Sequence, residues 1–415
     1  MQDRISQLDL LRGVALLGLP LMNMINFSMP MAAYLNPKAY LPNGPLNDFL
    51  FSFFHLFADQ KFMGLFAMLF GAGIILLAEK REQQNKSAAK IHYSRNFWLL
   101  LIGLCHGIFI WDGDILMIYA FIAMFVYLFR KLRGSWLVAL GVITLALSAY
   151  SSYLAGVYVE SLSGEARHAT AVIFAPDTAQ IQQDIEIYRE GFWALVESRL
   201  LGGNLASGPE SAIVISYFSL SIILKAAAMM LLGMGLFKLD ILRGKASSSA
   251  YKKLAIAGVA IGVILTGTGL IWNYSHDWSM DDYFTYGAIF NLVGSTFTSI
   301  GYIGLICLWF KLGRHLWIKG KIQSVGRMAF TNYLAQSFIC TYIFYGFGLG
   351  LYGELTRIEV LGVCVLLGLF QLAYSDLWLK AFRMGPLEWF WRTLTYFRFA
   401  PLIKERVVPA TEQRL

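Results

Sequence analysis

The sequence predicts an all-α integral membrane protein with about ten transmembrane helices. Of its 415 residues, 57% are hydrophobic and only 14% are charged, and the mean hydropathy is +0.56. Apolar runs recur along the whole chain, and many approach the roughly 20 residues needed to cross about 30 Å of hydrocarbon. The net charge of +8 comes largely from short basic loops, as the positive-inside rule expects. We therefore expect membrane lipids as partners and no nucleic acid.

The apolar runs are separated by loops whose charge alternates. The first run lacks a small-residue cleavage site, so it is interpreted as a retained span and not as a signal peptide. Lys and Arg gather after the second, fourth, sixth and eighth runs, which places both termini in the cytoplasm. The sequence thus predicts one polytopic domain over residues 1–415, with spans at about 8–27, 62–78, 97–111, 115–129, 136–159, 215–237, 254–274, 286–310, 328–349 and 358–379.

Two further segments are predicted to be helical without spanning the membrane. Residues 160–213 mix acidic and basic side chains and are too charged to cross. They are predicted to form amphipathic helices on the extracytoplasmic face, either as a lid or as a solvated connector. Residues 383–415 include the Trp- and Arg-rich stretch GPLEWFWRTLTYFRF, which is typical of an amphipathic interfacial helix on the cytoplasmic side.

The third and fourth runs form a predicted helical hairpin with an acidic tip. Each arm has about fifteen apolar residues, fewer than a full span needs, and the arms meet at Asp112 and Asp114. Carboxylates at such depth are costly unless they have partners or line a wet cavity. On one continuous helix, His106 and Asp114 would share a face with Ile110. His106 with Asp112 or Asp114 is therefore a candidate acid–base pair; alternatively, His106 bonds a neighbouring helix and Asp114 caps the second arm.

A second candidate pair precedes the predicted span at 62–78. His55 and Asp59 are four residues apart and face the same way on a helix. Lys61 follows them and is a candidate for binding a substrate or donor. The alternative interpretation is an interfacial anchor, in which Lys61 extends along the membrane surface to reach the headgroups.

Polar side chains inside two other spans are candidates for binding a substrate or donor. The first span carries Arg12, Asn23 and Asn26 on one stripe, and Arg12 could bind a phosphate or simply belong to the cap at the mouth of the helix. In the ninth span, Asn332 and Gln336 share a face and either bond between helices or line a path. The four cysteines lack metal-ligand spacing, so we expect packing roles for them and no metal site.

Several motifs resemble the YeiB family of bacterial membrane proteins. They include R-I-x-x-L-D-x-L-R-G from Arg4, D-x-K-F from Asp59, G-x-x-H-G from Gly103, W-x-G-D-I-L from Trp111 and G-R-M-A-x-T-N-Y-L-x-Q-S from Gly326. The resemblance implies a multi-pass protein of the bacterial inner membrane.

The first span is also similar to the transmembrane acyltransferase superfamily, which includes heparan-glucosaminide N-acetyltransferase. Those enzymes move acyl groups from cytoplasmic acyl-CoA to sugars on the far side of the membrane. Residues 11–15 fit their L-R-x-x-A stretch, but Asn23 and Asn26 stand where the O-acyltransferases carry an essential histidine. If the chemistry is retained, His106, or else His55, would supply the imidazole.

These patterns leave three hypotheses for the function. The first is a membrane acyltransferase with acyl-CoA, such as acetyl-CoA, as donor and a small-molecule or glycan hydroxyl or amine as acceptor. The second is a transporter or proton-coupled permease that uses the same His, Asp and Arg as a relay. The third is a non-enzymatic scaffold, and a homodimer fits any of them. A cytoplasmic tunnel that ends near His106 would favour the enzyme.

Overall fold

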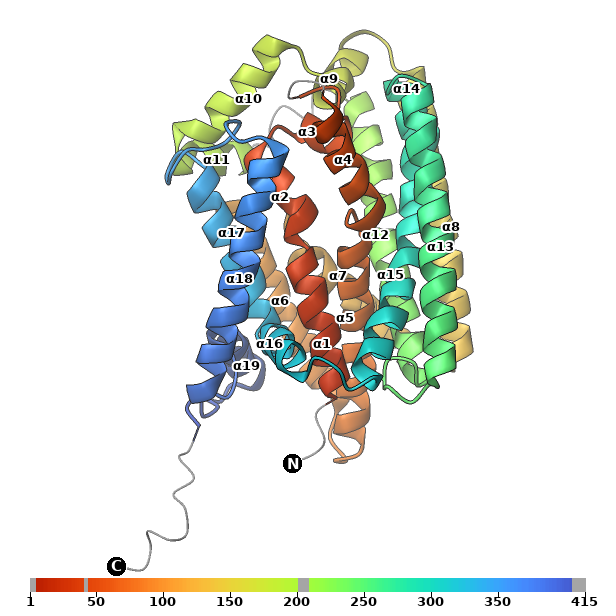
Figure 1. Ribbon diagram of the computed structural model, residues 1–415, viewed down its shortest axis with the longest axis vertical. Helices are drawn as coiled ribbons and strands as arrows, with labels where there is room; N and C mark the ends of the chain where they lie inside the picture. The colour runs from red at the N-terminus through yellow and green to blue at the C-terminus, as the bar shows by residue number, and fades with distance from the viewer. Residues whose placement is uncertain (1–4, 41–43, 201–208, 405–415) are drawn as a thin grey trace, which may run out of the picture.

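The computed structural model describes residues 5–40, 44–200 and 209–404, and within these ranges the chain is helical without a sheet (Figure 1). The predicted all-α membrane fold is confirmed. In chain order the elements are α1 (Ser6–Gly18), α2 (Pro20–Ser28), α3 (Met31–Leu35), α4 (Pro45–Phe57), α5 (Lys61–Glu82), α6 (Ala88–Phe109), α7 (Leu116–Val126), η1 (Tyr127–Lys131), α8 (Gly134–Ser161), α9 (Gly164–Phe174), α10 (Thr178–Glu190), α11 (Phe192–Leu200), α12 (Pro209–Lys238), α13 (Ser248–Ser275), α14 (Met280–Asp282), η3 (Tyr283–Gly287), α15 (Ala288–Lys311), α16 (Leu316–Arg327), α17 (Ala329–Phe344), α18 (Arg357–Ala381) and α19 (Pro386–Tyr396).

Seven helical stretches of the described residues are long and apolar enough to cross a membrane. They are Ser6–Ser28, Pro45–Glu82, Gly134–Ser161, Ala212–Lys238, Ser248–Ser275, Met280–Lys311 and Arg357–Ala381. The other three predicted spans correspond to α6, whose first two turns are polar, and to the short helices α7 (11 residues) and α17 (16 residues). The predicted count of ten spans therefore stays a prediction.

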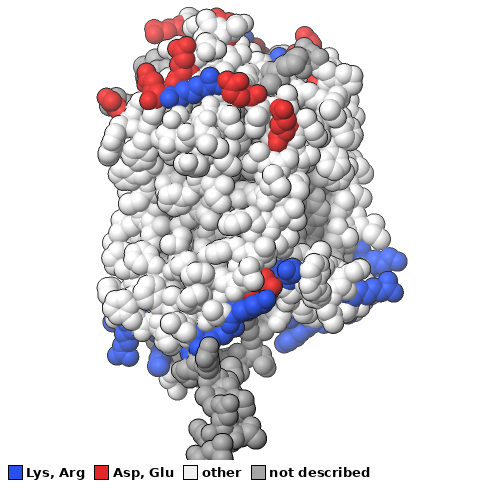
Figure 2. Space-filling model, turned by 60° about the vertical axis from the view of Figure 1, so that its left-hand side comes forward, with Lys and Arg blue, Asp and Glu red and all other residues white. Residues whose placement is uncertain are grey.

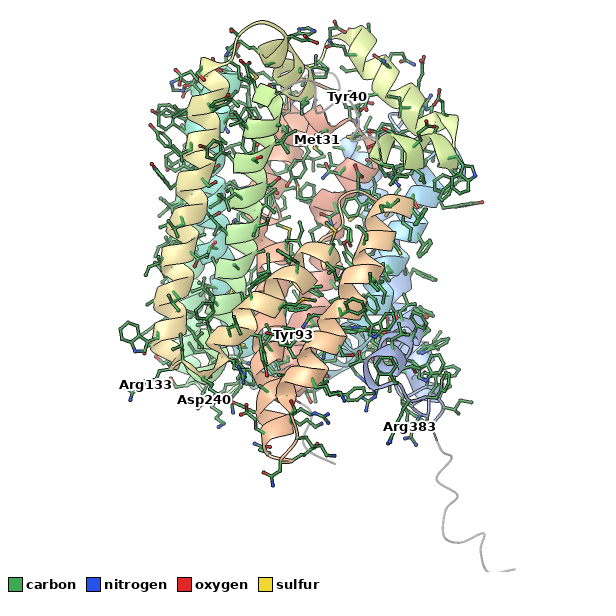
Figure 3. All side chains as sticks on the ribbon, turned by 180° about the vertical axis from the view of Figure 1, so that it is seen from behind. Met31, Tyr40, Tyr93, Arg133, Asp240 and Arg383 are labelled. Carbon is green, nitrogen blue, oxygen red and sulfur yellow. The ribbon has the colours of Figure 1, made fainter. Side chains whose placement is uncertain are left out.

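Charged side chains gather at the two ends of the bundle. Figure 2 shows a broad belt with few charges between a band of Lys and Arg at one end and a largely acidic band at the other. Arg133 and Arg383 lie near the basic end, and Met31 and Tyr40 lie near the opposite end (Figure 3). α1 begins at the basic end, where α16 and α19 also lie (Figure 1). We call this the basic end; its assignment to the cytoplasm follows from the positive-inside rule and stays a prediction.

The segment between α8 and α12 forms three short helices, α9 to α11, over the end opposite the basic end (Figure 1). α9 contacts α3 and α12, and α11 contacts α6. Within the predicted insertion 160–213, residues 201–208 lie outside the described residues, as do residues 405–415 of the predicted tail. The described parts include the short helices α9, α10, α11 and α19, and the predicted extracytoplasmic and cytoplasmic faces of these segments stay predictions.

α5 forms the centre of the bundle. It packs against α1, α6, α7, α12 and α15, and its Leu65, Met68 and Ala72 are fully buried. The contact with α12 is close because glycines face backbone on both sides. A Cβ atom on Gly71 would lie 2.1 Å from the carbonyl oxygen of Met230, and one on Gly233 would lie 1.9 Å from that of Met68. Small residues at such crossings allow helices to pack closely in membranes.

This crossing predicts that Gly71→Ala destabilises the protein, because the added methyl group must push the α12 backbone away. The expected loss is about 1–3 kcal/mol in the free energy of unfolding. Gly73→Ala is the matched control on the same helix, since a Cβ there meets no atom within 4 Å. Thermal unfolding of both variants in detergent makes the comparison, and equal transition temperatures would contradict the proposed packing constraint.

Candidate functional site

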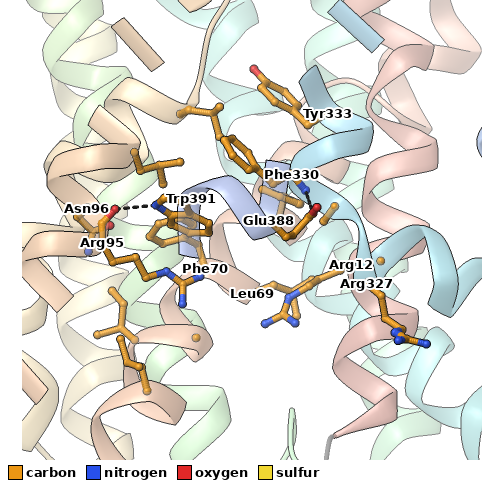
Figure 4. A pocket seen from close by; sticks show the side chains of 18 of the residues that line it. Arg12, Leu69, Phe70, Arg95, Asn96, Arg327, Phe330, Tyr333, Glu388 and Trp391 are labelled. Atoms are coloured by element: carbon orange, nitrogen blue, oxygen red, sulfur yellow. Dashed lines mark hydrogen bonds between the residues drawn. The ribbon is translucent and has the colours of Figure 1, made fainter. Parts of the chain in front are cut away.

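A cavity of about 280 Å³ opens among α1, α5, α6, α7, α16, α17 and α19 (Figure 4). We call it the donor cavity. Most of its wall is apolar, with charged groups toward one end. It is lined by Arg12, Phe66, Leu69, Phe70, Gly73, Ile74, Leu77, His92, Arg95, Asn96, Leu99, Leu116, Gly326, Arg327, Ala329, Phe330, Tyr333, Glu388 and Trp391.

Three arginines from three different helices stand at one end of the donor cavity. Figure 4 shows the guanidinium groups of Arg12, Arg95 and Arg327 on the side away from Tyr333. Arg12 lies 3.4 Å from the carboxylate of Asp9, and Arg95 stacks over the ring of Trp391 at 4.1 Å. Guanidinium groups bind phosphate oxygens in a planar, two-pronged geometry. This end is therefore suited to a phosphorylated ligand.

The tail helix α19 forms part of the cavity wall. Glu388 accepts hydrogen bonds from the backbone N–H groups of Phe330 and Thr331 and from the Thr331 hydroxyl, at 2.7, 3.2 and 2.5 Å. It thereby caps the first turn of α17. Burial raises the pKa of the Glu388 carboxyl above its usual value. The sequence predicted an interfacial helix here but not its contribution to a cavity.

At its other end the donor cavity reaches Tyr333 and Leu116, next to a buried imidazole–carboxylate pair. The His106 Nδ1 and Asp114 Oδ1 atoms are 2.9 Å apart, and the two residues are only 2% and 7% exposed. The Tyr333 hydroxyl lies 3.4 Å from the same carboxylate oxygen and accepts a 3.3 Å bond from the Ile115 N–H. The donor cavity and the pair are thus connected through one tyrosine.

Asp114 has two roles at once. Its Oδ2 atom accepts a 2.8 Å bond from the Met117 N–H at the start of α7, as an N-cap residue does, while Oδ1 faces His106. A carboxylate on Nδ1 fixes the imidazole tautomer and leaves Nε2 as the acceptor. In the described part of the chain no hydrogen-bond partner is found for the buried Nε2 atom. The pair therefore has the arrangement of an oriented general base.

The prediction that His106 and Asp114 lie on one face of a continuous helix was wrong, although the two side chains are in contact as predicted. His106 and Asp114 do not step along one helix, because α6 ends at Phe109 and α7 begins at Leu116. The hinge between them folds Asp114 back onto His106. Asp112 is exposed and is not bonded to His106, so the structure favours Asp114 as the partner.

A second, much smaller cavity lies on the other side of Tyr333. It has a volume of about 10 Å³, room for one water molecule, and is lined by Pro20, Asn23, Met24, Phe27, Trp111, Tyr333, Gln336, Ser337 and Cys340. Gln336 also donates to Leu16 O and Gln371 Oε1, at 3.0 Å each. Asn23 and Gln336 therefore line a cavity, which is one of the roles that the sequence analysis considered for them.

The remaining amides of the predicted set have different environments. Asn332 is fully buried and donates to Val325 O at 3.3 Å and to Ser375 Oγ at 2.8 Å, so it bonds between helices. Asn26 lines neither cavity, and its buried Oδ1 has no hydrogen-bond partner among the described residues.

The second candidate pair lies in a separate buried network at the break between α4 and α5. His55 Nδ1 is 3.3 Å from Asp59 Oδ2, and Asp59 also accepts from Tyr34 and, at 2.6 Å, from Asn291. Lys61 donates to His55 O at 2.6 Å and to Asn291 Oδ1 at 2.5 Å. Lys61 is 0% exposed. The alternative interpretation of Lys61 as a side chain that reaches the headgroups was therefore wrong, because buried acceptors satisfy its charge.

Lys225, on α12, adds a second buried lysine beside this network. It donates to Gln60 Oε1, Leu292 O and Ser295 Oγ at 2.6 to 2.7 Å. Its position in the middle of a predicted span was a signal of function or of buried pairing that the sequence analysis did not weigh. No group of three or more His, Cys, Asp or Glu that could hold a metal occurs within residues 5–40, 44–200 and 209–404.

Comparison with known proteins decides the family. A family model described as "Protein of unknown function (DUF418)" matches residues 236–398. The chain is 33% identical over 405 residues to "Uncharacterized protein YeiB" of Escherichia coli (strain K12), which covers 97% of this chain and 99% of that protein. This chain belongs to the YeiB family. "Uncharacterized protein YxaH" of Bacillus subtilis (strain 168) is 30% identical over 415 residues, with 98% of each chain covered.

The resemblance seen in the sequence is thus confirmed for the YeiB family along nearly the whole chain. The DUF418 match contains Tyr333 and Glu388, whereas Arg12, His106 and Asp114 lie before it, within the span shared with the YeiB relative. The candidate site therefore combines residues from both halves of a YeiB-family chain.

Sequence reasoning missed Tyr333, Arg95, Arg327 and Glu388. The arginines were interpreted only as topological charges, and Tyr333 stands directly after the chosen Asn332. The sequence did contain a signal for this site. Arg95 and Arg327 lie at the predicted cytoplasmic ends of helices and Arg12 lies in the first span, so the three could meet at the basic end. Which helices are neighbours, however, could not be seen in the sequence.

The double role of Asp114 predicts that Asp114→Ala destabilises the protein strongly, because it leaves His106 Nδ1 without its partner and α7 without its cap. We expect a loss of about 2–4 kcal/mol in the free energy of unfolding. Asp112→Ala, in the same hinge but exposed, is expected to change it by less than about 0.5 kcal/mol. Thermal unfolding in detergent measures both, and similar effects of the two variants would contradict the assigned roles.

Proposed function

We propose that the protein is a membrane acyltransferase of the bacterial inner membrane. It would move an acyl group, such as acetyl, from a cytoplasmic acyl-CoA donor to a hydroxyl or amine of an extracytoplasmic acceptor such as an envelope glycan. The observation that carries the proposal is a single cavity that begins at Arg12, Arg95 and Arg327 and ends at Tyr333. Tyr333 is in turn bonded to Asp114 of the His106 pair.

The donor cavity matches the chemistry of an acyl-CoA. The nucleotide of coenzyme A carries phosphates, which three guanidinium groups would hold at the basic end. The pantetheine arm and acyl group are uncharged and slender, and the wall beyond the arginines is mostly apolar. The positive charge of this end would also raise the local concentration of an anionic donor.

His106 would act as the general base. Its Nε2 would take the proton from the acceptor hydroxyl or amine as the acceptor oxygen or nitrogen attacks the thioester carbonyl. Asp114 on Nδ1 would hold the imidazole in the required tautomer and stabilise the imidazolium that forms. When the carbon–sulfur bond breaks, the coenzyme A sulfur would leave as a thiolate and take the proton from Nε2. The products are an acylated acceptor and free coenzyme A, with all atoms accounted for.

The direct test measures release of coenzyme A by the purified protein in liposomes, given labelled acetyl-CoA and a mixed envelope-glycan extract. The proposal predicts label in a glycan product and a rate that falls about 10²- to 10⁴-fold in His106→Ala, which lacks the base. His168→Ala is the matched control, since His168 is exposed on α9, and it should retain the wild-type rate. No release and no donor binding by the wild-type protein would overturn the proposal.

A transporter or proton-coupled permease is the second candidate, and one observation favours it. α4 and α5 form a helix broken at Ala58 to Gln60, with Gln60 in the left-handed region (φ 60°). At this break lie Asp59, His55 and Lys61, bonded to one another and to Asn291. Broken helices with buried ionisable groups form ion sites in secondary transporters. In the same liposomes, flux without coenzyme A release, lost in Asp59→Asn, would support this candidate.

A further inference from the structure

Tyr333 lies between two cavities that occupy different depths in the bundle. Of the described residues that line the donor cavity and the small cavity, Tyr333 is the one common to both. Its side chain is 2% exposed. Among the residues that the structure describes, the Tyr333 ring therefore lies between the space that begins at the three arginines and the space beside Asn23 and Cys340.

The order of residues along the helices shows which way each cavity points. α1 and α2 run from the basic end towards the opposite end (Figure 1), and Arg12 on α1 lines the donor cavity while Asn23 on α2 lines the small one. Along α17, Phe330 lines the donor cavity and Cys340 the small cavity, with Tyr333 between them in sequence. The small cavity thus lies farther from the basic end.

The hydroxyl of Tyr333 is held by the same hinge that carries the base. It lies 3.4 Å from Asp114 Oδ1 and accepts the 3.3 Å bond from Ile115 N–H, and its ring centroid is 5.6 Å from that of His106. The ring is thereby fixed across the path beside the imidazole. A protein that binds a soluble thioester from one side needs such a barrier, because a water-filled path would allow hydrolysis and proton leakage.

We propose that Tyr333 is the barrier that separates the donor cavity from an acceptor-side cavity lined by Asn23, Trp111, Gln336, Ser337 and Cys340. It acts as a positioning residue: the bond to Asp114 holds the ring closed, and the acceptor's attacking group approaches from the small cavity. The names donor and acceptor rest on the proposed function, whereas the barrier itself rests on the two cavities and can be tested without catalysis.

The test uses a membrane-impermeant, negatively charged thiol reagent, 2-sulfonatoethyl methanethiosulfonate, applied to membrane vesicles from the basic end alone. Cys340 lines the small cavity and serves as the native reporter, and peptide mass spectrometry identifies the cysteine that reacts. In Tyr333→Ala the labelling of Cys340 should rise at least about ten-fold, since a buried thiol that gains access to water becomes reactive. Tyr333→Phe, which keeps the ring, should label much less than Tyr333→Ala.

Two controls separate opening of the barrier from general loosening. Gly73→Cys reports on the donor cavity, where an added Cβ meets no atom within 4 Å, and it should be labelled with or without Tyr333→Ala. The buried Cys307 and Cys364 should stay unlabelled in every variant. If Tyr333→Ala is not recovered folded, Tyr333→Leu, which also lacks the ring, replaces it.

Each result has one meaning. A second reporter for the small cavity is Asn23→Cys. If Gly73→Cys is labelled but both Cys340 and Asn23→Cys stay unlabelled in the variant without the ring, the barrier is overturned and the donor cavity is not. An unlabelled Gly73→Cys would overturn both, because the cavity would then be closed to the basic end. Equal labelling of Cys340 in the wild type and in Tyr333→Ala would likewise show that Tyr333 closes nothing.

Discussion

The hydrogen bond between His106 and Asp114 is the interaction on which the account of this site depends. A carboxylate inside a membrane bundle needs partners, since water cannot solvate it there. Asp114 finds three: the imidazole of His106, the N–H of Met117 and the hydroxyl of Tyr333. One buried side chain therefore orients the candidate base, begins α7 and fixes the ring at the inner end of the donor cavity. The short hairpin of α6 and α7 makes this possible because its hinge turns the chain back at Asp114, and α11 packs beside it, where Arg199 donates to Ile108 O at 3.2 Å.

The second polar centre has a different character. In the network of Asp59, Lys61 and Asn291 each amide and charge that the structure describes is bonded within the protein, and these residues line neither the donor cavity nor the small cavity. The pair at His106 instead has an acceptor nitrogen without a partner among the described residues, and its Asp114 is bonded to Tyr333, which lines both cavities. A fully satisfied network stabilises and orients helices, whereas an unsatisfied group beside a cavity is placed for a ligand. This contrast is the physical reason for preferring His106 over His55 as the reactive imidazole.

The sequence predicted the membrane fold and both His–Asp pairs because these follow from local patterns: apolar length, basic loops and short spacing. It failed where the answer depends on which helices are neighbours. The alternative interpretation placed Lys61 at the membrane surface, but α15 supplies Asn291 as its buried partner. Arg95 and Arg327 were interpreted as topological charges, yet they line one cavity because α6 and the end of α16 meet there beside α1 and α19. Likewise, the place of Tyr333 between two cavities depends on packing against the hinge, which no spacing along a single chain encodes.

The central claim is that the space between the three arginines and Tyr333 holds the pantetheine arm and acyl group of an acyl-CoA. The most direct measurement is a cryo-electron microscopy structure of the protein in lipid nanodiscs, saturated with a thioether analogue of acetyl-CoA that cannot transfer its acyl group. The account predicts the analogue in the donor cavity, with its phosphates at Arg12, Arg95 and Arg327 and its acyl end against Tyr333. An empty donor cavity under these conditions, or the analogue bound elsewhere, would contradict it.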